Sequence, residues 1–261
     1  MDSDTKSDFD IEVDSKESAF YLDAAKYWEQ VPPTVDGMLG GLSSISDIDL
    51  KGSQRFLNSI YQLVECPGKE RALDGGAGIG RITQGFLMKN FPVVDLVEQD
   101  RHFLEEAKKS LKPTYHRGQF FNIGLQKFTP ETCVYDIMWV QWVLGHLTDE
   151  DLISFLKRCK LGLKPRGLIV LKENLTSSGE VEMDNTDSSV TRPHALLVEL
   201  IKKAGLRVIK EQKQQRFPSD LYEVKSMLIF FFLHEKMEEK QRNTATANLK
   251  HLNSKLKRRR Q

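Results

Sequence analysis

The stretch Leu73–Arg81, LDGGAGIGR, decides the fold, because it places four glycines within nine residues of a chain that has only 17 in 261. An apolar segment that begins at Arg71 leads into it and is predicted to be a short buried strand. Residues 79–91 follow with apolar side chains at helical spacing. A strand, a glycine turn and a helix open a βαβ unit, in which the bare backbone of the turn lets a ligand approach closely.

A second apolar strand, Val93–Val97, ends at Glu98, 18 residues beyond Gly80. An acid at the tip of this strand is placed to accept hydrogen bonds from both hydroxyls of a ribose. The dinucleotide pattern G-x-G-x-x-G is not present, and Asp74 precedes the loop. An acid in that place repels phosphate but suits the ammonium of S-adenosylmethionine (SAM). The loop is therefore predicted to bind SAM, rather than a dinucleotide or no ligand.

The rest of the chain fits one α/β domain, since 39% of its residues are hydrophobic. Helices are predicted over Ser18–Gln30 and Ser46–Leu63, as an N-terminal helical cover, and a loop over Glu173–Thr191. The alternation of strands and helices after Arg71 indicates a doubly wound, mostly parallel sheet of seven strands. The apolar run Met227–Leu233 favours an interior strand. Such sheets bind ligands at the carboxyl ends of their strands.

Charge is uneven along the chain although its net value is +1. Residues 1–17 hold seven acids against two lysines, and residues 235–261 hold nine Lys and Arg against three Glu. Both ends are predicted to be mobile, which leaves 18–234 as the methyltransferase domain. The run Lys255–Arg260 is typical of a nuclear localisation signal or a nucleic-acid patch, with solvated disorder as an equal alternative.

Three cysteines without paired metal spacing predict no metal site and favour a reducing compartment. The longest apolar run has seven residues, whereas about 18 are needed to span a bilayer. A secretory signal pattern is not seen at the N-terminus. We therefore expect a monomer of the nucleus and cytoplasm that binds no membrane. Because the middle region is neutral, an RNA methyltransferase with a basic stripe is disfavoured.

Further stretches give the chain a specific resemblance: VPPTVDGMLGG at 31–41, QWVLGHLTD at 141–149 and DSSV at 187–190. With these, the chain resembles the eukaryotic protein α-N-methyltransferases, which methylate X-Pro-Lys N-termini and have a Rossmann-like class I fold. The similarity extends from about Phe20 to Phe230. It implies transfer of methyl groups from SAM to the α-amino group of such N-termini. The alternative is a catalytically weak binding module that recognises N-terminal peptides.

The resemblance also implies roles for individual residues at matching positions. The catalytic residues would be Asp187, Asp184 and His146. The residues that hold SAM would be Gly76, Arg81, Glu98, Leu125, Gln126 and Gln141, with Trp28 closing over the cofactor. The residues that bind the substrate N-terminus would be Tyr27, Leu39, Trp142, Asn174, Ser189 and Tyr222.

Some of these residues also have a plainer interpretation. Asp184 and Asp187 are ordinary helix-capping types, and His146 suits a structural position just before the helix cap at Thr148. Trp142 and Tyr27 could be core aromatics, although a flat ring beside a cationic substrate is typical of a methyl-acceptor pocket. An ammonium substrate favours the functional interpretation of the two acids.

Overall fold

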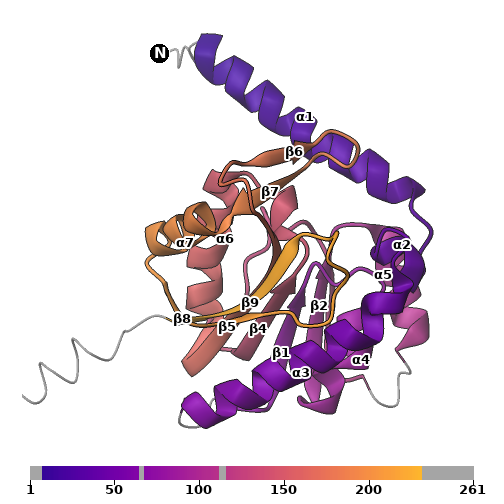
Figure 1. Cartoon of the computed structure of the whole chain (residues 1–261), viewed down its shortest axis with the longest axis vertical. Coiled ribbons are helices and arrows are strands. Elements are labelled where there is room, and N and C mark those ends of the chain that lie inside the picture. The colour runs from indigo at the N-terminus through magenta and orange to yellow at the C-terminus, as the bar shows by residue number, and fades with distance from the viewer. Residues whose placement is uncertain (1–7, 65–67, 112–115, 231–261) are drawn as a thin grey trace, which may run out of the picture. The chain divides into compact units, whose positions relative to one another are not determined.

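The computed structural model describes residues 8–64, 68–111 and 116–230, and Figure 1 shows their arrangement. The predicted basic tail, including Lys255–Arg260, lies outside the described residues. None of the described helices has both the length and the apolar character needed to cross a membrane.

A mixed sheet forms the centre of the fold. Its order within the described residues is β3-β2-β1-β4-β5-β7-β6, and β9 pairs with both β5 and β8. Strands β1 to β5 are parallel where they pair, and β9 is antiparallel to β5 and β8. The bounds are β1 Arg71–Gly75, β2 Val93–Glu98, β3 Phe120–Asn122, β4 Tyr135–Gln141, β5 Leu163–Thr176, β6 Glu182–Asp184, β7 Ser189–Pro193, β8 Arg207–Lys213 and β9 Glu223–Phe230.

The doubly wound fold is confirmed, and β9 is interior as its apolar run predicts. The seven strands expected from the sequence are β1 to β5, β8 and β9. The prediction of a loop over Glu173–Thr191 is wrong. There β5 continues to Thr176, and the hairpin of β6 and β7 follows, with β7 pairing parallel to the end of β5. The polar residues of this hairpin lack the apolar alternation that reveals a strand, so the pairing is set by tertiary contacts.

Of the three helices predicted above, one has the expected bounds and two differ. Their bounds are α1 Asp8–Gln30, α2 Val35–Met38, η1 Ser43–Ile45, α3 Ser46–Leu63, α4 Arg81–Gly85, η2 Leu87–Lys89, α5 Arg101–Ser110, η3 Leu144–His146, α6 Asp149–Gly162 and α7 His194–Lys203. Helix α3 has the predicted bounds, whereas α1 begins well before Ser18, inside the segment predicted to be mobile. The predicted helix over 79–91 is instead two short turns, interrupted at Phe86, whose φ is −140°.

Helices cover both faces of the sheet. On one face, Phe56 of α3 and Phe86 pack against Trp139 of β4. The neighbouring β4 residue, Met138, points to the opposite face, where its side chain lies beside Gly162 of α6. This alternation is the reason that β4 is buried along its whole length.

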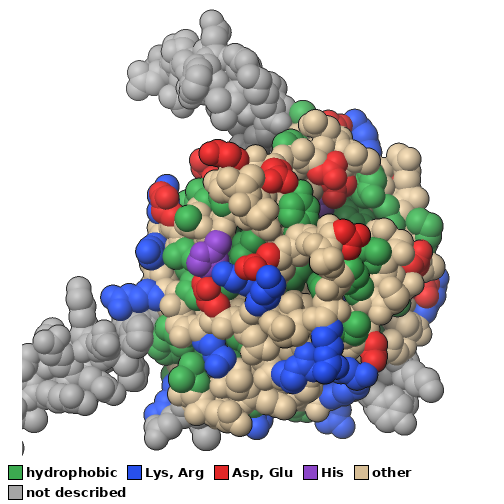
Figure 2. All heavy atoms as spheres, viewed as in Figure 1, with side chains coloured by type: hydrophobic (Ala, Val, Ile, Leu, Met, Phe, Trp, Pro, Cys, Tyr) green, Lys and Arg blue, Asp and Glu red, His purple; other side chains and the backbone are tan. Residues whose placement is uncertain are grey.

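Helix α1 lies beside the hairpin of β6 and β7 (Figure 1), and both are near the carboxyl ends of the parallel strands. The Ser188 hydroxyl donates to the Phe20 carbonyl at 3.0 Å, which ties the hairpin to α1. Tyr21 donates to Asp151 at the start of α6 and accepts from the Thr148 amide at 3.2 Å. On the face drawn in Figure 2, most acidic side chains lie in the upper half, and most Lys and Arg lie in the lower half.

Candidate active site

The glycine loop has a backbone conformation and close contacts that favour glycine over any residue with a side chain. Gly76, Gly78 and Gly80 have φ angles of 72°, 54° and 77°, in the left-handed region that favours glycine. A Cβ on Gly76 would lie 2.6 Å from the side chain of Val143, and one on Gly78 would lie 2.8 Å from the sulfur of Met38. The loop therefore forms a bare backbone wall, as its sequence predicts.

A cleft with about 860 Å³ of empty space opens beside this wall. It lies at the carboxyl ends of β1, β2 and β4, where a doubly wound sheet binds its ligands. All seven residues predicted to hold SAM line it, namely Trp28, Gly76, Arg81, Glu98, Leu125, Gln126 and Gln141.

The chemistry of this lining fits SAM. Glu98 accepts hydrogen bonds from the amides of Gly78 and Asp100, both at 2.8 Å, and each carboxylate oxygen has a further lone pair for a ribose hydroxyl. Burial raises the pKa of Glu98 to about 7. Arg81 offers a cation for a carboxylate, and apolar side chains such as Phe103 and Ile123 offer a surface for a flat base.

A second cleft of about 900 Å³ adjoins the first. Five of the six residues predicted to bind the substrate line it, together with Asp187 and His146: Leu39, Trp142, Asn174, Ser189 and Tyr222. Trp28, Met38, Trp142 and His146 line both clefts, so the two sites meet at these side chains.

Two predicted residues are not brought into either cleft. Tyr27 packs edge-on against Trp28, with ring centroids 5.4 Å apart. Asp184 is exposed, and its carboxylate accepts from the amide of Thr186 at 2.8 Å. Asp184 thus stabilises the turn of the hairpin, and it does not cap a helix as its plainer interpretation expects, because the N-cap residue of α7 is Pro193.

His146, Trp28 and Asp187 form a polar group where the clefts meet. The Trp28 indole N–H donates to His146 Nε2 at 3.0 Å, and Asp187 Oδ2 lies 3.9 Å from the same nitrogen. The Ser189 hydroxyl donates to Asp187 Oδ1 at 2.6 Å. Burial lowers the pKa of His146 below its ordinary value, so the neutral ring is favoured at pH 7. Because Nε2 accepts from Trp28, its ring proton is placed on Nδ1.

Trp142 has an unusual backbone conformation at this junction. Its φ is +54°, which is uncommon for a bulky residue. Its indole Nε1 is buried and has no hydrogen-bond partner among the described residues. Strained backbone and an unpaired buried donor cluster at functional sites, so both observations favour a role in binding over one in the core.

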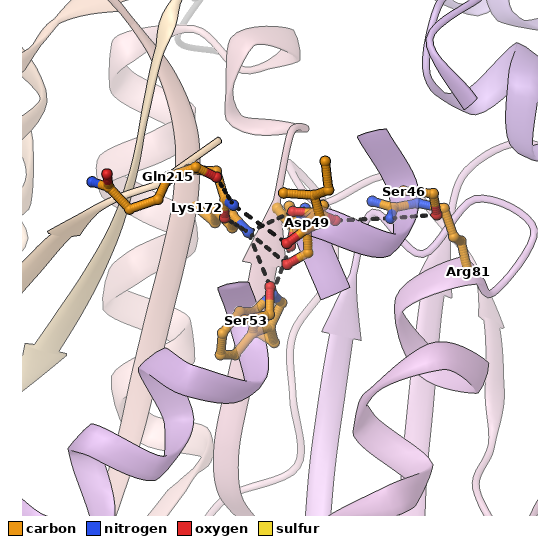
Figure 3. A network of polar contacts seen from close by, with 10 residues as sticks. Ser46, Asp49, Ser53, Arg81, Lys172 and Gln215 are labelled. Atoms are coloured by element: carbon orange, nitrogen blue, oxygen red, sulfur yellow. Dashed lines mark hydrogen bonds and ion pairs between the residues drawn. The ribbon is translucent and has the colours of Figure 1, made fainter. Parts of the chain in front are cut away.

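A buried charged network lies behind the SAM cleft and was missed from the sequence. Asp49 and Lys172 are both 0% exposed and form an ion pair, and Asp49 also pairs with Arg81 at 2.8 Å (Figure 3). From the sequence alone, Asp49 is an ordinary acid in the first turn of a helix. The charged pair Lys172-Glu173, at the carboxyl end of an apolar strand, is the signal that could have found this network.

Glu173 was also missed. Its carboxylate accepts from the amides of Val143 and Leu144 at 2.9 Å and 2.8 Å. Burial raises its pKa to about 7. It lines the second cleft and holds the backbone between Trp142 and His146 in place.

Comparisons with known proteins agree with this geometry. A family model described as AdoMet dependent proline di-methyltransferase matches residues 16–229, where AdoMet is SAM. The N-terminal Xaa-Pro-Lys N-methyltransferase 1-A of Xenopus laevis is 47% identical over 216 residues, which cover 82% of this chain and 96% of that protein. The alpha N-terminal protein methyltransferase 1 of Drosophila melanogaster is 50% identical over 216 residues, which cover 81% and 76%.

A solved structure agrees as well. A SAM-dependent methyltransferase from Leishmania major is 38% identical with a TM-score of 0.77, covering 81% of this chain and 83% of that one. The similarity thus spans the glycine loop, both clefts and the hairpin. The chain belongs to the AdoMet-dependent proline di-methyltransferase family and is a SAM-dependent methyltransferase.

Proposed function

We propose that the protein transfers methyl groups from SAM to the α-amino group of protein N-termini of the X-Pro-Lys type. The observation that carries the proposal is the meeting of two clefts at Trp28, Trp142 and His146, with Asp187 beside them. One cleft fits SAM, and the other is open enough for a peptide end. Relatives at 46% and 47% identity are named N-terminal Xaa-Pro-Lys N-methyltransferases, and one at 50% identity is named an alpha N-terminal protein methyltransferase.

In the first cleft, we assign Glu98 to the ribose hydroxyls and Arg81 to the methionyl carboxylate. Gly76, Leu125 and Gln126 would enclose the remainder, and Trp28 covers the cleft from α1. When bound, SAM supplies an electrophilic methyl group on a sulfonium. The acceptor nitrogen must therefore present a lone pair to it.

A peptide α-ammonium has a pKa of about 7.7–8.0, so part of the substrate is already neutral near pH 7. The chain must hold the amine, orient its lone pair and accept one proton. We assign this proton to Asp187, because its carboxylate lines the peptide cleft and has free lone pairs. The hydrogen bond from Trp28 occupies His146 Nε2. His146 therefore acts mainly as a neutral side chain that lines the cleft and positions the substrate.

The peptide cleft also suits the second and third residues of such a substrate. Proline has no amide donor to satisfy, and Leu39, Ile45 and Val224 give the cleft apolar walls. A lysine in the third position would meet acids of the hairpin, where Glu182 accepts from the Tyr222 hydroxyl at 2.6 Å. Asp184 is exposed on the same short strand.

The test is methylation of hexapeptides that begin Ser-Pro-Lys or Ala-Pro-Lys, with labelled SAM and mass spectrometry of the product. We expect α-N-methylated peptides, and no product from the same peptides with acetylated N-termini. Label on internal lysine side chains with none at the N-terminus would refute the proposal. Tight peptide binding without turnover would instead favour the binding module.

We also propose that the protein is a monomer and acts in the nucleus and the cytoplasm. Deleting 255–261 should lower the nuclear fraction of a tagged protein without changing peptide turnover. An equal nuclear fraction would reduce this basic run to solvated charge.

A further inference from the structure

The buried network behind the SAM cleft is centred on Asp49 of α3. Its two carboxylate oxygens accept from the amide of Gln141, each at 2.9 Å. The same carboxylate accepts from Arg81 Nη1 at 2.8 Å and from the ammonium of Lys172. Figure 3 shows Lys172 and Arg81 approaching Asp49 from opposite sides.

Two of these three donors line the SAM cleft, whereas Asp49 and Lys172 do not. Gln141 is fixed at its other end as well, because its Oε1 accepts from the indole of Trp139 at 3.0 Å. Arg81 uses Nη1 for Asp49, which leaves Nη2 and Nε without a hydrogen-bond partner among the described residues. Asp49 thus sets the direction in which Arg81 and Gln141 face the cleft.

Lys172 fixes the Asp49 carboxylate from the side away from the cleft. Lys172 Nζ is surrounded by acceptors, the carboxylate of Asp49, Ser53 Oγ at 3.1 Å and Gln214 Oε1 at 2.9 Å, which suit the charged ammonium. One carboxylate is therefore bonded to two cations. Burial lowers the pKa of Lys172, and the carboxylate of Asp49 opposes this effect. Asp74 is another buried acid near Arg81. It accepts from Thr83 at 2.6 Å, and burial raises its pKa to about 6, which leaves it largely ionised at pH 7. The carboxylates of Asp49 and Asp74 thus balance the two cations.

We propose that Asp49 is a positioning residue for SAM, which aims Arg81 and Gln141 at the methionyl carboxylate, and that Lys172 holds the Asp49 carboxylate in the orientation that this requires. The proposal rests on the use of SAM in the proposed function. It does not depend on which amine receives the methyl group.

Two ligands separate this role from a general role in folding. S-adenosylhomocysteine carries the amino-acid carboxylate, whereas 5′-methylthioadenosine has the same adenosine and thioether but lacks the carboxylate and the ammonium. With the full chain in calorimetry, Asp49→Asn should raise the dissociation constant of S-adenosylhomocysteine by about tenfold or more, the size of a lost charge-assisted contact. The constant for 5′-methylthioadenosine should change by less than about twofold.

Asp47→Asn is the matched control, because Asp47 lies on the same helix, is exposed and, within the described part of the chain, pairs only with Lys51 at i,i+4. It should leave both dissociation constants unchanged. Equal losses for the two ligands in Asp49→Asn would reduce Asp49 to a structural residue. Unchanged S-adenosylhomocysteine affinity would overturn the proposal.

A second variant covers the case in which Asp49→Asn folds poorly, since it leaves Lys172 unpaired. The double variant Asp49→Asn/Lys172→Met removes both charges and should melt at a higher temperature than the single variant, while its S-adenosylhomocysteine affinity stays low. Restored affinity in the double variant would mean that Asp49 only neutralises Lys172, which contradicts the proposal. If peptides are not methylated but the two ligands are still discriminated, the proposed function fails and this inference stands.

Discussion

Asp187 and His146 lie side by side, but their hydrogen bonds give them different capacities as a base. We expect Asp187→Asn to lower turnover of a Ser-Pro-Lys peptide by about 100-fold, the range of a positioned general base. His146→Gln should lower it less, and its deficit should shrink from pH 7 to pH 9 as free amine becomes available. SAM affinity should stay nearly unchanged in both variants.

The matched control is Asp184→Asn at saturating peptide, since Asp184 lies on the same hairpin but is exposed and lines neither cleft. A lost attraction between Asp184 and the substrate lysine would raise KM, whereas kcat should stay unchanged. Initial rates between pH 6.5 and 9 measure all three variants. Full activity in Asp187→Asn would leave His146 as the base. A loss in Asp184→Asn as large as that in Asp187→Asn would mean that the two acids act as one pair.

Glu98 gives SAM binding a pH dependence. Its pKa of about 7 means that the carboxyl is partly protonated at neutral pH, and only the carboxylate can accept from both ribose hydroxyls. The dissociation constant for SAM should therefore fall by up to about tenfold between pH 6 and pH 8. Glu98→Gln should weaken binding by about tenfold and flatten this dependence. Calorimetry of both proteins measures it, and the difference between them removes the titration of the SAM amine itself.

Half-buried Glu105 on α5 is a suitable control, because its hydrogen bond with Lys108 lowers its pKa. Glu105→Gln should keep the wild-type pH profile. A profile for Glu98→Gln that is as steep as the wild-type profile would remove Glu98 from the ribose site.

At the scale of elements, the cover formed by α1 depends on Tyr21. Its hydroxyl donates to Asp151 and accepts from the Thr148 amide, and α1 carries Trp28 over both clefts. Tyr21→Phe keeps the ring but removes both bonds, so it should weaken SAM binding by about threefold to tenfold and speed hydrogen exchange in α1.

Tyr61→Phe provides the comparison, because the Tyr61 hydroxyl is buried without a partner among the described residues. Loss of the Tyr61 hydroxyl should leave SAM affinity unchanged, and the free energy of unfolding should equal or exceed that of the wild type. If Tyr21→Phe behaves like Tyr61→Phe in both measurements, α1 is held by packing alone.

The elements differ in how far the sequence reveals them. Helix α3 and the strands of the parallel sheet could be predicted, because apolar periodicity and glycine turns are local signals. The hairpin of β6 and β7 could not, since it is polar and pairs only once β5 is in place. In the clefts, a residue that belongs to a local motif, such as Glu98, could likewise be predicted from the sequence. Asp49 could not, because its role depends on partners about 32 to 123 positions away.

At the scale of the whole molecule, buried carboxyls make stability depend on pH in an unusual direction. Burial raises the pKa of Glu98 and of Glu173 to about 7, above the value of about 4.3 expected in the unfolded chain. Between these values the folded chain holds protons that the unfolded chain has released. The free energy of unfolding therefore falls as pH rises through 7.

We expect a loss of roughly 1–2 kcal/mol between pH 6.5 and pH 8, measured by urea unfolding. The lowered pKa of His146 acts in the opposite direction, but mainly below about pH 6.5. Glu173→Gln keeps an oxygen for the amides of Val143 and Leu144 and should remove about half of the slope. Saturating S-adenosylhomocysteine should remove the contribution of Glu98 to this slope, because the ribose hydroxyls favour the ionised form of Glu98. Stability that is flat or rising over this interval would show that neither carboxyl is protonated in the folded protein at neutral pH.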